Sequence, residues 1–181
     1  ALALSLPGLQ AQDLRSVGGG AAVTGRAIAL LGPGTGLGVS GLVPAQNGGY
    51  VALAGEGGHV TLAATDDDEA ALLSLLRQDF PHVSAERLLS GSGLVLLYQA
   101  VCRLQGVAAL ALHPAQVSEA ALQQTNVQCQ RAVHLFTGFL GSVAGNLALT
   151  LGALGGVYVG GGIVPKLGHA FDEALFRRRF E

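Results

Sequence analysis

Two glycine-rich segments that lie close together in the chain constrain its fold more than any other feature. The first reads Gly32-Pro33-Gly34-Thr35-Gly36-Leu37-Gly38. Four glycines and one hydroxyl in these seven positions describe a backbone that something must approach closely, because glycine has no Cβ atom and adopts positive φ angles at little cost. Backbone N–H groups in such a loop can form a concave site for anions, and a phosphate group fits it.

The second glycine-rich segment carries two side chains that form hydrogen bonds. It reads Gly55-Glu56-Gly57-Gly58-His59, so a carboxylate and an imidazole stand three residues apart among glycines. Together they can donate hydrogen bonds to, and accept them from, neighbouring hydroxyls of one polyol, whereas a simple turn would need neither group. The stretch from Leu31 to His59 therefore offers a candidate phosphate site followed by a candidate sugar site.

Short apolar runs bounded by glycine predict a sheet around these segments. The predicted strands are residues 27–31, 37–43, 50–53 and 155–159. The first two are joined by the glycine loop and are expected to form an antiparallel hairpin, and Asn47-Gly48 predicts the turn before the third. The fourth runs into Gly160-Gly161-Gly162 and then a helix, a geometry in which a nucleotide can lie against bare backbone.

Apolar periodicity predicts helices over much of the remaining chain. Residues 1–6 are interpreted as the last turns of a helix, residues 9–25 as a connector and residues 172–181 as a terminal helix. Two predicted helices begin at polar caps, Thr65 and Ser118. The helix after Thr65 has an apolar face formed by Leu72, Leu73, Leu76 and Phe80. A second helix is predicted to run through Leu104, and a long one to cover residues 127–151.

The long helix has two interpretations. No charge occurs from Leu135 to Leu154, and Gly141 and Gly145 have the spacing found in pairs of membrane helices. Polar side chains interrupt the helix, however, no aromatic belt brackets it, and the chain has no second span to pair with. A buried core helix is therefore favoured, in which these glycines and Gly138 let another element approach closely.

Composition excludes several classes of protein. Half of the residues are hydrophobic, 12% are charged and the net charge is −2, which is typical of one aliphatic globular domain in 181 residues. Basic residues cluster only at Arg177-Arg178-Arg179, so the chain lacks the basic face that nucleic-acid binding requires. Cys102 and Cys129 form neither a C-x-x-C pair nor a cysteine-histidine cluster, which suits a reducing cytoplasm.

Acidic residues supply two weaker candidates. Asp66 to Glu69 could bind a metal ion, but consecutive carboxylates at a helix start are more often caps and solvated charge, which is the favoured interpretation. Glu86 lies between two predicted helices beside Ser90-Gly91-Ser92-Gly93, where a carboxylate can point into a cleft. The alternative for Glu86 is an exposed acid, paired with Arg87 or with nothing.

Taken in order, these pieces resemble the bacterial ATP-dependent glucokinases, of the hexokinase and actin-like ATPase superfamily. The resemblance is carried by Gly34 to Gly38 as a second phosphate loop, Leu53 to His59 as a sugar-binding stretch, His82 to Arg87 with Leu89-Ser90-Gly91, Gly145 to Leu149 in a last helix, and Gly160 to Pro165 as an adenosine loop. It implies an α/β fold of the actin-like, ribonuclease H-like type, with a mixed sheet flanked by helices.

The resemblance also indicates that the chain is a fragment. Residues 1–181 would form part of the large lobe, without the small lobe that carries the first phosphate loop, and without the final strands. The catalytic general base of the family is an aspartate whose position would fall just upstream of Ala1. This chain would then supply no catalytic residue, and the fragment alone is expected to be inactive.

The implied reaction is transfer of the ATP γ-phosphate to the 6-hydroxyl of glucose, with Mg²⁺, at the entry to glycolysis. The implied sugar ligands are Glu56, His59 and Glu86, and the implied nucleotide ligands are Gly34, Thr35, Gly36, Gly160, Gly161, Gly162 and Ile163. His59 is a conceivable general base on chemistry alone, but the resemblance assigns that role to the missing aspartate.

The implied partners are glucose and ATP, in a cytoplasmic homodimer with neither a nucleic-acid nor a membrane partner. One alternative is a non-catalytic sugar-binding sensor on the same fold, although no DNA-binding helix pair or cysteine-rich zinc motif is visible. The other is a membrane or assembly protein that uses the apolar helix from Leu135 to Leu154 as its interface.

Overall fold

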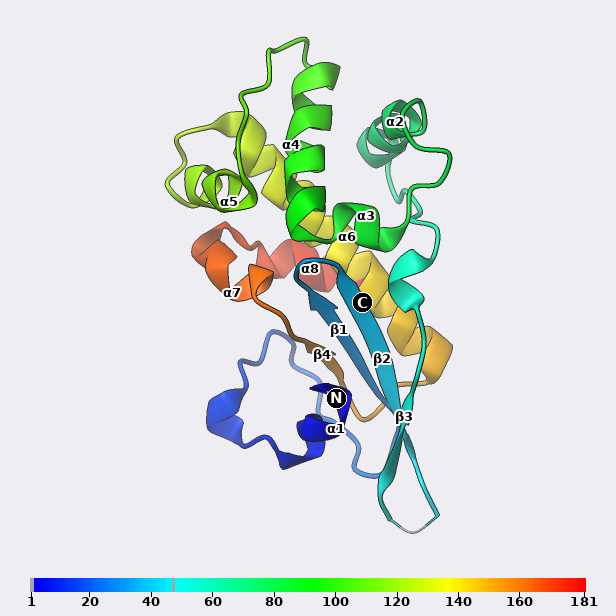
Figure 1. The fold of residues 1–181 in the computed structure, drawn as a ribbon. Coiled ribbons are helices and arrows are strands. Elements are labelled where there is room, and N and C mark those ends of the chain that lie inside the picture. Colours follow the sequence, from blue (N-terminus) through cyan, green and yellow to red (C-terminus); the bar gives the residue numbers. More distant parts are fainter. Residues whose placement is uncertain (1, 47) are drawn as a thin grey trace.

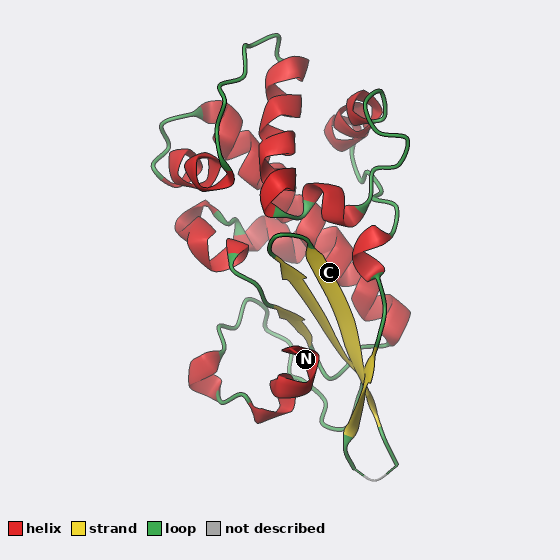
Figure 2. Cartoon of the chain, in the orientation of Figure 1, coloured by secondary structure: helices red, strands yellow, loops and turns green. Residues whose placement is uncertain are grey.

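The computed structural model describes residues 2–46 and 48–181, and its helices surround one small sheet (Figures 1 and 2). The strands are β1 (Ile28–Pro33), β2 (Leu37–Pro44), β3 (Tyr50–Leu53) and β4 (Val157–Val159). The helices are α1 (Leu2–Ser5), α2 (Asp67–Leu76), α3 (Ala85–Leu88), α4 (Gly91–Leu104), α5 (Pro114–Leu122), α6 (Val127–Leu151), α7 (Ile163–Leu167) and α8 (Glu173–Phe180). Helix α6 passes behind the hairpin of β1 and β2, and α4 stands above its tip (Figure 1).

The sheet is mixed, as expected. Its order is β3-β2-β1-β4, with β1 antiparallel to β2 and parallel to β4, so the predicted hairpin is confirmed. The first strand extends two residues further into the glycine segment than predicted, whereas the second begins at Leu37 as predicted: Pro33 pairs with Leu37, and only residues 34–36 form the turn. Because β1 lies between two neighbours, the turn projects from a fixed base. Asn47 lies outside the described residues, so the Asn47-Gly48 turn stays a prediction.

Alternate residues of β1 face two hydrophobic cores, as the two-residue period of a strand requires. Leu31 joins the main core, to which α4 and α6 contribute many of their apolar side chains. Ile28 and Leu30 face the opposite side, where they pack with Leu42 and with Leu6 of the N-terminal segment. The sheet therefore separates a large helical layer from a small N-terminal one.

The glycines of α6 form the surface on which α8 packs. A Cβ atom on Gly141 would lie 2.6 Å from the backbone oxygen of Phe176, and one on Gly145 would lie 2.8 Å from that of Phe180. Both distances are shorter than a carbon–oxygen contact allows in a close-packed interior, so both positions need glycine. The prediction that these glycines admit another element is confirmed, and that element is α8.

Helix α6 is, within the part of the chain that the structure describes, the one helix long and apolar enough to cross a membrane. Of its most apolar window, 61% is buried inside the fold. Its small-residue face, which membrane helices use for pairing, is covered here by α8. A core helix therefore accounts for both its length and its glycines.

Two predictions about helix starts are wrong. Asp66 caps α2 by accepting the N–H of Glu69, whereas the Thr65 hydroxyl donates to the Glu69 carboxylate. Ser118 lies inside α5, and its hydroxyl donates to the carbonyl of Pro114. Helix α5 begins at that proline because the first turn of a helix does not need the N–H that proline lacks.

The acidic residues at the start of α2 are paired with arginines. Arg179 of α8 contacts Glu69 at 3.0 Å and also binds Asp66, and Arg131 of α6 binds Asp68. The backbone hydrogen bond from Glu69, together with the Arg179 guanidinium, holds the pKa of Asp66 below its usual value. The predicted cap is confirmed, but Glu69 is buried and paired with Arg179 rather than solvated. Within residues 2–46 and 48–181, no group of three or more His, Cys, Asp and Glu side chains is placed to hold a metal ion.

Both cysteines are free and buried, as expected in the absence of a disulfide pattern. Burial raises the pKa of the Cys129 thiol to about 11. Since the thiolate is the reactive form, Cys129 is an inert apolar side chain at neutral pH.

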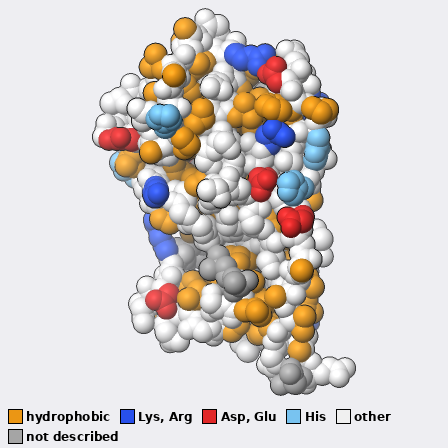
Figure 3. Space-filling model, viewed as in Figure 1, with side chains coloured by type: hydrophobic (Ala, Val, Ile, Leu, Met, Phe, Trp, Pro, Cys, Tyr) orange, Lys and Arg blue, Asp and Glu red, His pale blue; other side chains and the backbone are white. Residues whose placement is uncertain are grey.

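The face of the molecule in Figure 3 carries scattered charges. Lys and Arg side chains are separated by neutral and apolar ones, and acidic side chains lie near several of them. This face therefore has no broad basic patch, in keeping with the low content of Lys and Arg in the sequence.

Candidate functional site

The turn between β1 and β2 presents unpaired donors. It consists of Gly34, Thr35 and Gly36, and it is held by two hydrogen bonds of 2.8 Å: Gly34 N–H donates to the Gly36 carbonyl, and the Gly34 carbonyl accepts from Gly91 N–H at the start of α4. The N–H groups of Thr35 and Gly36 have no acceptor among the described residues, and the Thr35 side chain is exposed. Two N–H groups and a hydroxyl are thus available to a phosphate oxygen.

The two glycines of this turn have different surroundings. A Cβ atom on Gly34 would meet nothing within 4 Å, so its surface is open to a ligand. A Cβ atom on Gly36 would lie 2.4 Å from Oε2 of Glu86, so a larger residue there would displace the Glu86 carboxylate. The bare backbone predicted from the sequence is therefore suited to a ligand at one position and to internal packing at the other.

The second glycine-rich segment folds back onto the first. Residues Gly57–His59 form a 3-10 turn after β3. Gly58 is buried, and a Cβ atom on it would lie 2.3 Å from the backbone oxygen of Leu37, the first residue of β2. Because Gly58 permits this approach, His59 is brought beside the Thr35 turn.

Glu86 contacts both segments. It lies in the one-turn helix α3, which is tied to the chain after His59 by a 2.9 Å hydrogen bond from Ala85 N–H to the Val60 carbonyl. Its Oε2 accepts the backbone N–H of Leu37 at 2.8 Å, and its Oε1 lies 3.8 Å from Nε2 of His59. The side chain is 35% exposed, so a ligand can reach it.

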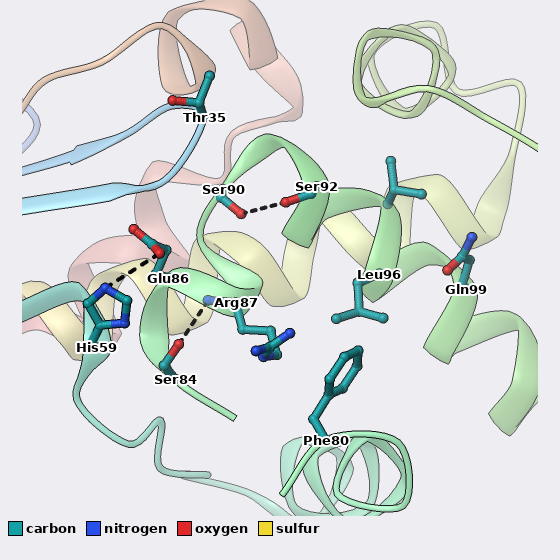
Figure 4. A pocket seen from close by; sticks show the side chains of 11 residues that line it. Thr35, His59, Phe80, Ser84, Glu86, Arg87, Ser90, Ser92, Leu96 and Gln99 are labelled. Atoms are coloured by element: carbon teal, nitrogen blue, oxygen red, sulfur yellow. Dashed lines mark hydrogen bonds and ion pairs between the residues drawn. The ribbon is translucent and has the colours of Figure 1, made fainter. Parts of the chain in front are cut away.

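Thr35, His59 and Glu86 line one pocket of about 400 Å³ (Figure 4). His59 and Glu86 face each other, and Thr35 stands across the pocket from them. Towards the other end, the Arg87 guanidinium lies 4.2 Å from the ring centre of Phe80, beside apolar side chains of α4. The pocket therefore has a polar end at the glycine turn and a mixed aromatic and aliphatic end.

Phe80, predicted on the buried face of α2, is half-buried against the main core and also lines this pocket. Helix α2 ends at Leu76, and Phe80 follows it in a turn. The cause is Pro81, since the residue before a proline is disfavoured in helical conformation.

Glu56 is not among the residues that line the pocket. It is exposed, and its carboxylate makes no hydrogen bond to a described residue. Its backbone carbonyl accepts the N–H of His59 at 3.0 Å, which ties the two residues into one turn. Its role as a sugar ligand stays a prediction.

The glycine triplet after β4 lies against the turn end of β1, outside the pocket lining. Gly161 has a φ angle of +81°, and a Cβ atom on it would lie 2.3 Å from the backbone oxygen of Pro33. A Cβ atom on Gly162 would meet nothing within 4 Å, and α7 begins at Ile163. The candidate adenosine loop thus adjoins the candidate phosphate loop, and Gly162 leaves open backbone there.

Sequence reasoning missed the serines and Arg87 in the pocket wall. Ser90 caps α4 by accepting the N–H of Gly93 at 3.1 Å, and Ser92 follows in its first turn. The sequence did predict a helix start beside Glu86, but it did not identify Ser90 as the cap. No sequence signal could have placed that helix against the Thr35 turn, because the contact joins segments far apart in the chain.

Comparison with known proteins supplies the family. The family model described as Glucokinase matches residues 1–181. The glucokinase of Aromatoleum aromaticum is 59% identical over 181 residues, which are 100% of this chain and 54% of that protein. The chain thus spans about half the length of this curated relative.

Solved structures agree with this match. The crystal structure of glucokinase from an Antarctic psychrotroph has a TM-score of 0.92 and 40% identity, over 98% of this chain and 55% of that one. The glucokinase from Balamuthia mandrillaris in complex with glucose has the same fold, with a TM-score of 0.74 and 22% identity, over 87% of this chain and 46% of that one. These likenesses confirm the expected α/β fold with its mixed sheet and flanking helices, and the chain belongs to the glucokinase family.

Proposed function

We propose that the complete protein transfers the γ-phosphate of MgATP to the 6-hydroxyl of glucose, giving glucose 6-phosphate. The observation that carries this proposal is the shared pocket, which Thr35 of the glycine turn lines together with Glu86 and His59. Phosphoryl transfer asks a protein mainly to align the nucleophile with the phosphate and to stabilise the charge on the transferred group. A phosphate site beside a polar site for hydroxyls suits that task.

On the nucleotide side, the N–H groups of Thr35 and Gly36 and the Thr35 hydroxyl would donate to phosphate oxygens. The open surface of Gly34 would allow the phosphate to approach. Residues 160–163 would hold the adenosine part, because Gly161 lies against Pro33, directly before the phosphate-binding turn. Mg²⁺ would enter with the nucleotide as part of the substrate.

On the sugar side, Glu56, His59 and Glu86 would bind hydroxyls and so aim the 6-hydroxyl at the phosphate. We place the general base outside these 181 residues, as the family resemblance implies, and residues 1–181 in the central part of the large lobe. Glucose and ATP are the proposed partners, in a cytoplasmic homodimer without a nucleic-acid or membrane partner.

A coupled assay for glucose 6-phosphate tests the proposal. Full-length protein is expected to phosphorylate glucose with ATP and Mg²⁺ in preference to mannose and fructose. The 181-residue chain alone is expected to show essentially no turnover, since loss of a general base alone costs about a hundredfold to ten-thousandfold in rate. Glucose binding without turnover by the full-length protein would instead support a non-catalytic sensor.

Gly34→Ala separates ligand binding from folding. Because a Cβ atom at this position meets no protein atom within 4 Å, we expect an unchanged melting temperature. The methyl group would occupy the proposed phosphate approach, so the KM for ATP is expected to rise about tenfold or more, as after the loss of a hydrogen bond to a charged group. Steady-state kinetics and thermal denaturation of the same preparation check both. An unchanged KM for ATP would remove the turn from the nucleotide site.

A further inference from the structure

We propose that Glu86 positions the phosphate-binding turn as well as the sugar, and thereby couples occupancy of the hexose site to the nucleotide site. The inference rests on the proposed function and adds a role for Glu86 beyond that of a sugar ligand. Its two carboxylate oxygens have different neighbours: Oε2 accepts the N–H of Leu37 at 2.8 Å, whereas Oε1 lies 3.8 Å from Nε2 of His59 (Figure 4). One side chain therefore connects the two proposed subsites.

The bond to Leu37 fixes the end of the turn. Gly91 N–H holds the turn at its start by donating to the Gly34 carbonyl, and Glu86 holds it at Leu37, directly after the free N–H groups. Pro33 pairs with Leu37 across the hairpin but, as a proline, has no backbone N–H to donate a hydrogen bond there. The directions of the two free donors thus depend on a carboxylate that comes from another part of the chain.

Glu86 is in close contact with the turn. A Cβ atom on Gly36 would lie 2.4 Å from Oε2 of Glu86, so the carboxylate lies directly against the turn. The Glu86 side chain is 35% exposed and therefore retains some freedom. A sugar hydroxyl that donates to Oε1 would restrict this freedom and so strengthen the hydrogen bond from Leu37 N–H to Oε2. Coupling of this kind is reciprocal. A bound nucleotide would therefore raise the affinity for glucose by the same factor by which bound glucose raises the affinity for the nucleotide.

Three variants of the full-length enzyme separate the two roles. Glu86→Gln keeps a carbonyl oxygen that can accept from Leu37 and changes only the second oxygen. It is expected to raise the KM for glucose and to leave the KM for ATP within about twofold. Glu86→Ala loses both contacts and is expected to raise the KM for glucose and the KM for ATP, the latter about tenfold or more. Glu86→Asp keeps the charge but shortens the side chain, and is expected to behave like Glu86→Ala towards ATP.

The outcomes distinguish this inference from the proposed function. If Glu86→Ala raises the KM for glucose alone, Glu86 is only a sugar ligand and the coupling is overturned. If the KM for glucose does not change in any variant, the proposed sugar site is overturned as well.

Hydrogen exchange on the full-length protein gives a readout independent of turnover. Without the acceptor, the Leu37 amide is expected to exchange about tenfold faster in Glu86→Ala than in the unmodified chain, and within about twofold of it in Glu86→Gln. The amide of Leu42, buried in the same strand, serves as control and should be unchanged if the fold is intact. Equal exchange of Leu37 in all three proteins would overturn the positioning role.

Discussion

Replacement of Arg179 by methionine is expected to lower the free energy of unfolding by about 3–5 kcal/mol, because it leaves a buried carboxylate without its cation. The side chain of Glu69 is only 2% exposed, and its Oε1 lies 3.0 Å from the Arg179 guanidinium. Its Oε2 already accepts from the backbone N–H and the hydroxyl of Thr65. Gly138 of α6 lies beside this pair, and a Cβ atom there would make an ordinary contact of 3.4 Å with Glu69 Oε1.

Urea denaturation of the chain measures this loss, and an exposed ion pair provides the matched control. Arg103 and Asp79 form such a pair, and both side chains are 46% exposed. Arg103→Met should cost less than about 1 kcal/mol, because water solvates the remaining carboxylate. Adding Glu69→Gln to Arg179→Met should recover part of the stability, since the charge that lost its partner is then removed. Equal losses in the two arginine variants would show that Glu69 gains no stability from Arg179.

The hairpin and the long helix were predictable because each rests on local sequence. Apolar runs on both sides of the glycine loop favour two short strands, and the turn between them limits how they can pair. The unbroken apolar period of α6 likewise identified a buried helix. Helix starts were less predictable: Thr65 and Asp66 are adjacent residues that can both cap, and tertiary contacts decided between them.

The contacts that build the pocket were not predictable, because they join distant segments. Thr35, His59 and Glu86 were named from motifs, yet the bond from Leu37 to Glu86 connects two of those motifs through a backbone atom that has no signature in the sequence. The spacing of Gly138, Gly141 and Gly145 predicted that another element packs closely on this face of α6, but it did not identify α8 as that element. The candidate site side chains could thus be identified from the sequence. The elements that pack against the glycines, and the acceptors of the backbone N–H groups, could not.

Replacement of Gly58 by alanine is expected to reduce kcat/KM of the full-length enzyme about a hundredfold or more. The added Cβ atom would lie 2.3 Å from the backbone oxygen of Leu37, and no side-chain rotation can relieve a clash with backbone. The contact must lengthen by about 1 Å to reach an ordinary carbon–oxygen separation, so either His59 or the end of the phosphate-binding turn moves. Displacements of about 1 Å in a catalytic arrangement cost roughly two orders of magnitude in rate.

Gly55→Ala is the matched control for Gly58→Ala, because it adds the same methyl group three residues earlier in the same motif. A Cβ atom on Gly55 would meet nothing within 4 Å, and neither glycine has a positive φ angle. Gly55→Ala should therefore leave kcat/KM within about twofold, while Gly58→Ala should also lose about 1–3 kcal/mol of stability through overpacking. If the two variants retain equal activity, the approach of Gly58 to Leu37 does not hold the sugar motif against the phosphate turn. A loss of activity in Gly58→Ala alone would indicate that this single backbone contact aligns the two halves of the site.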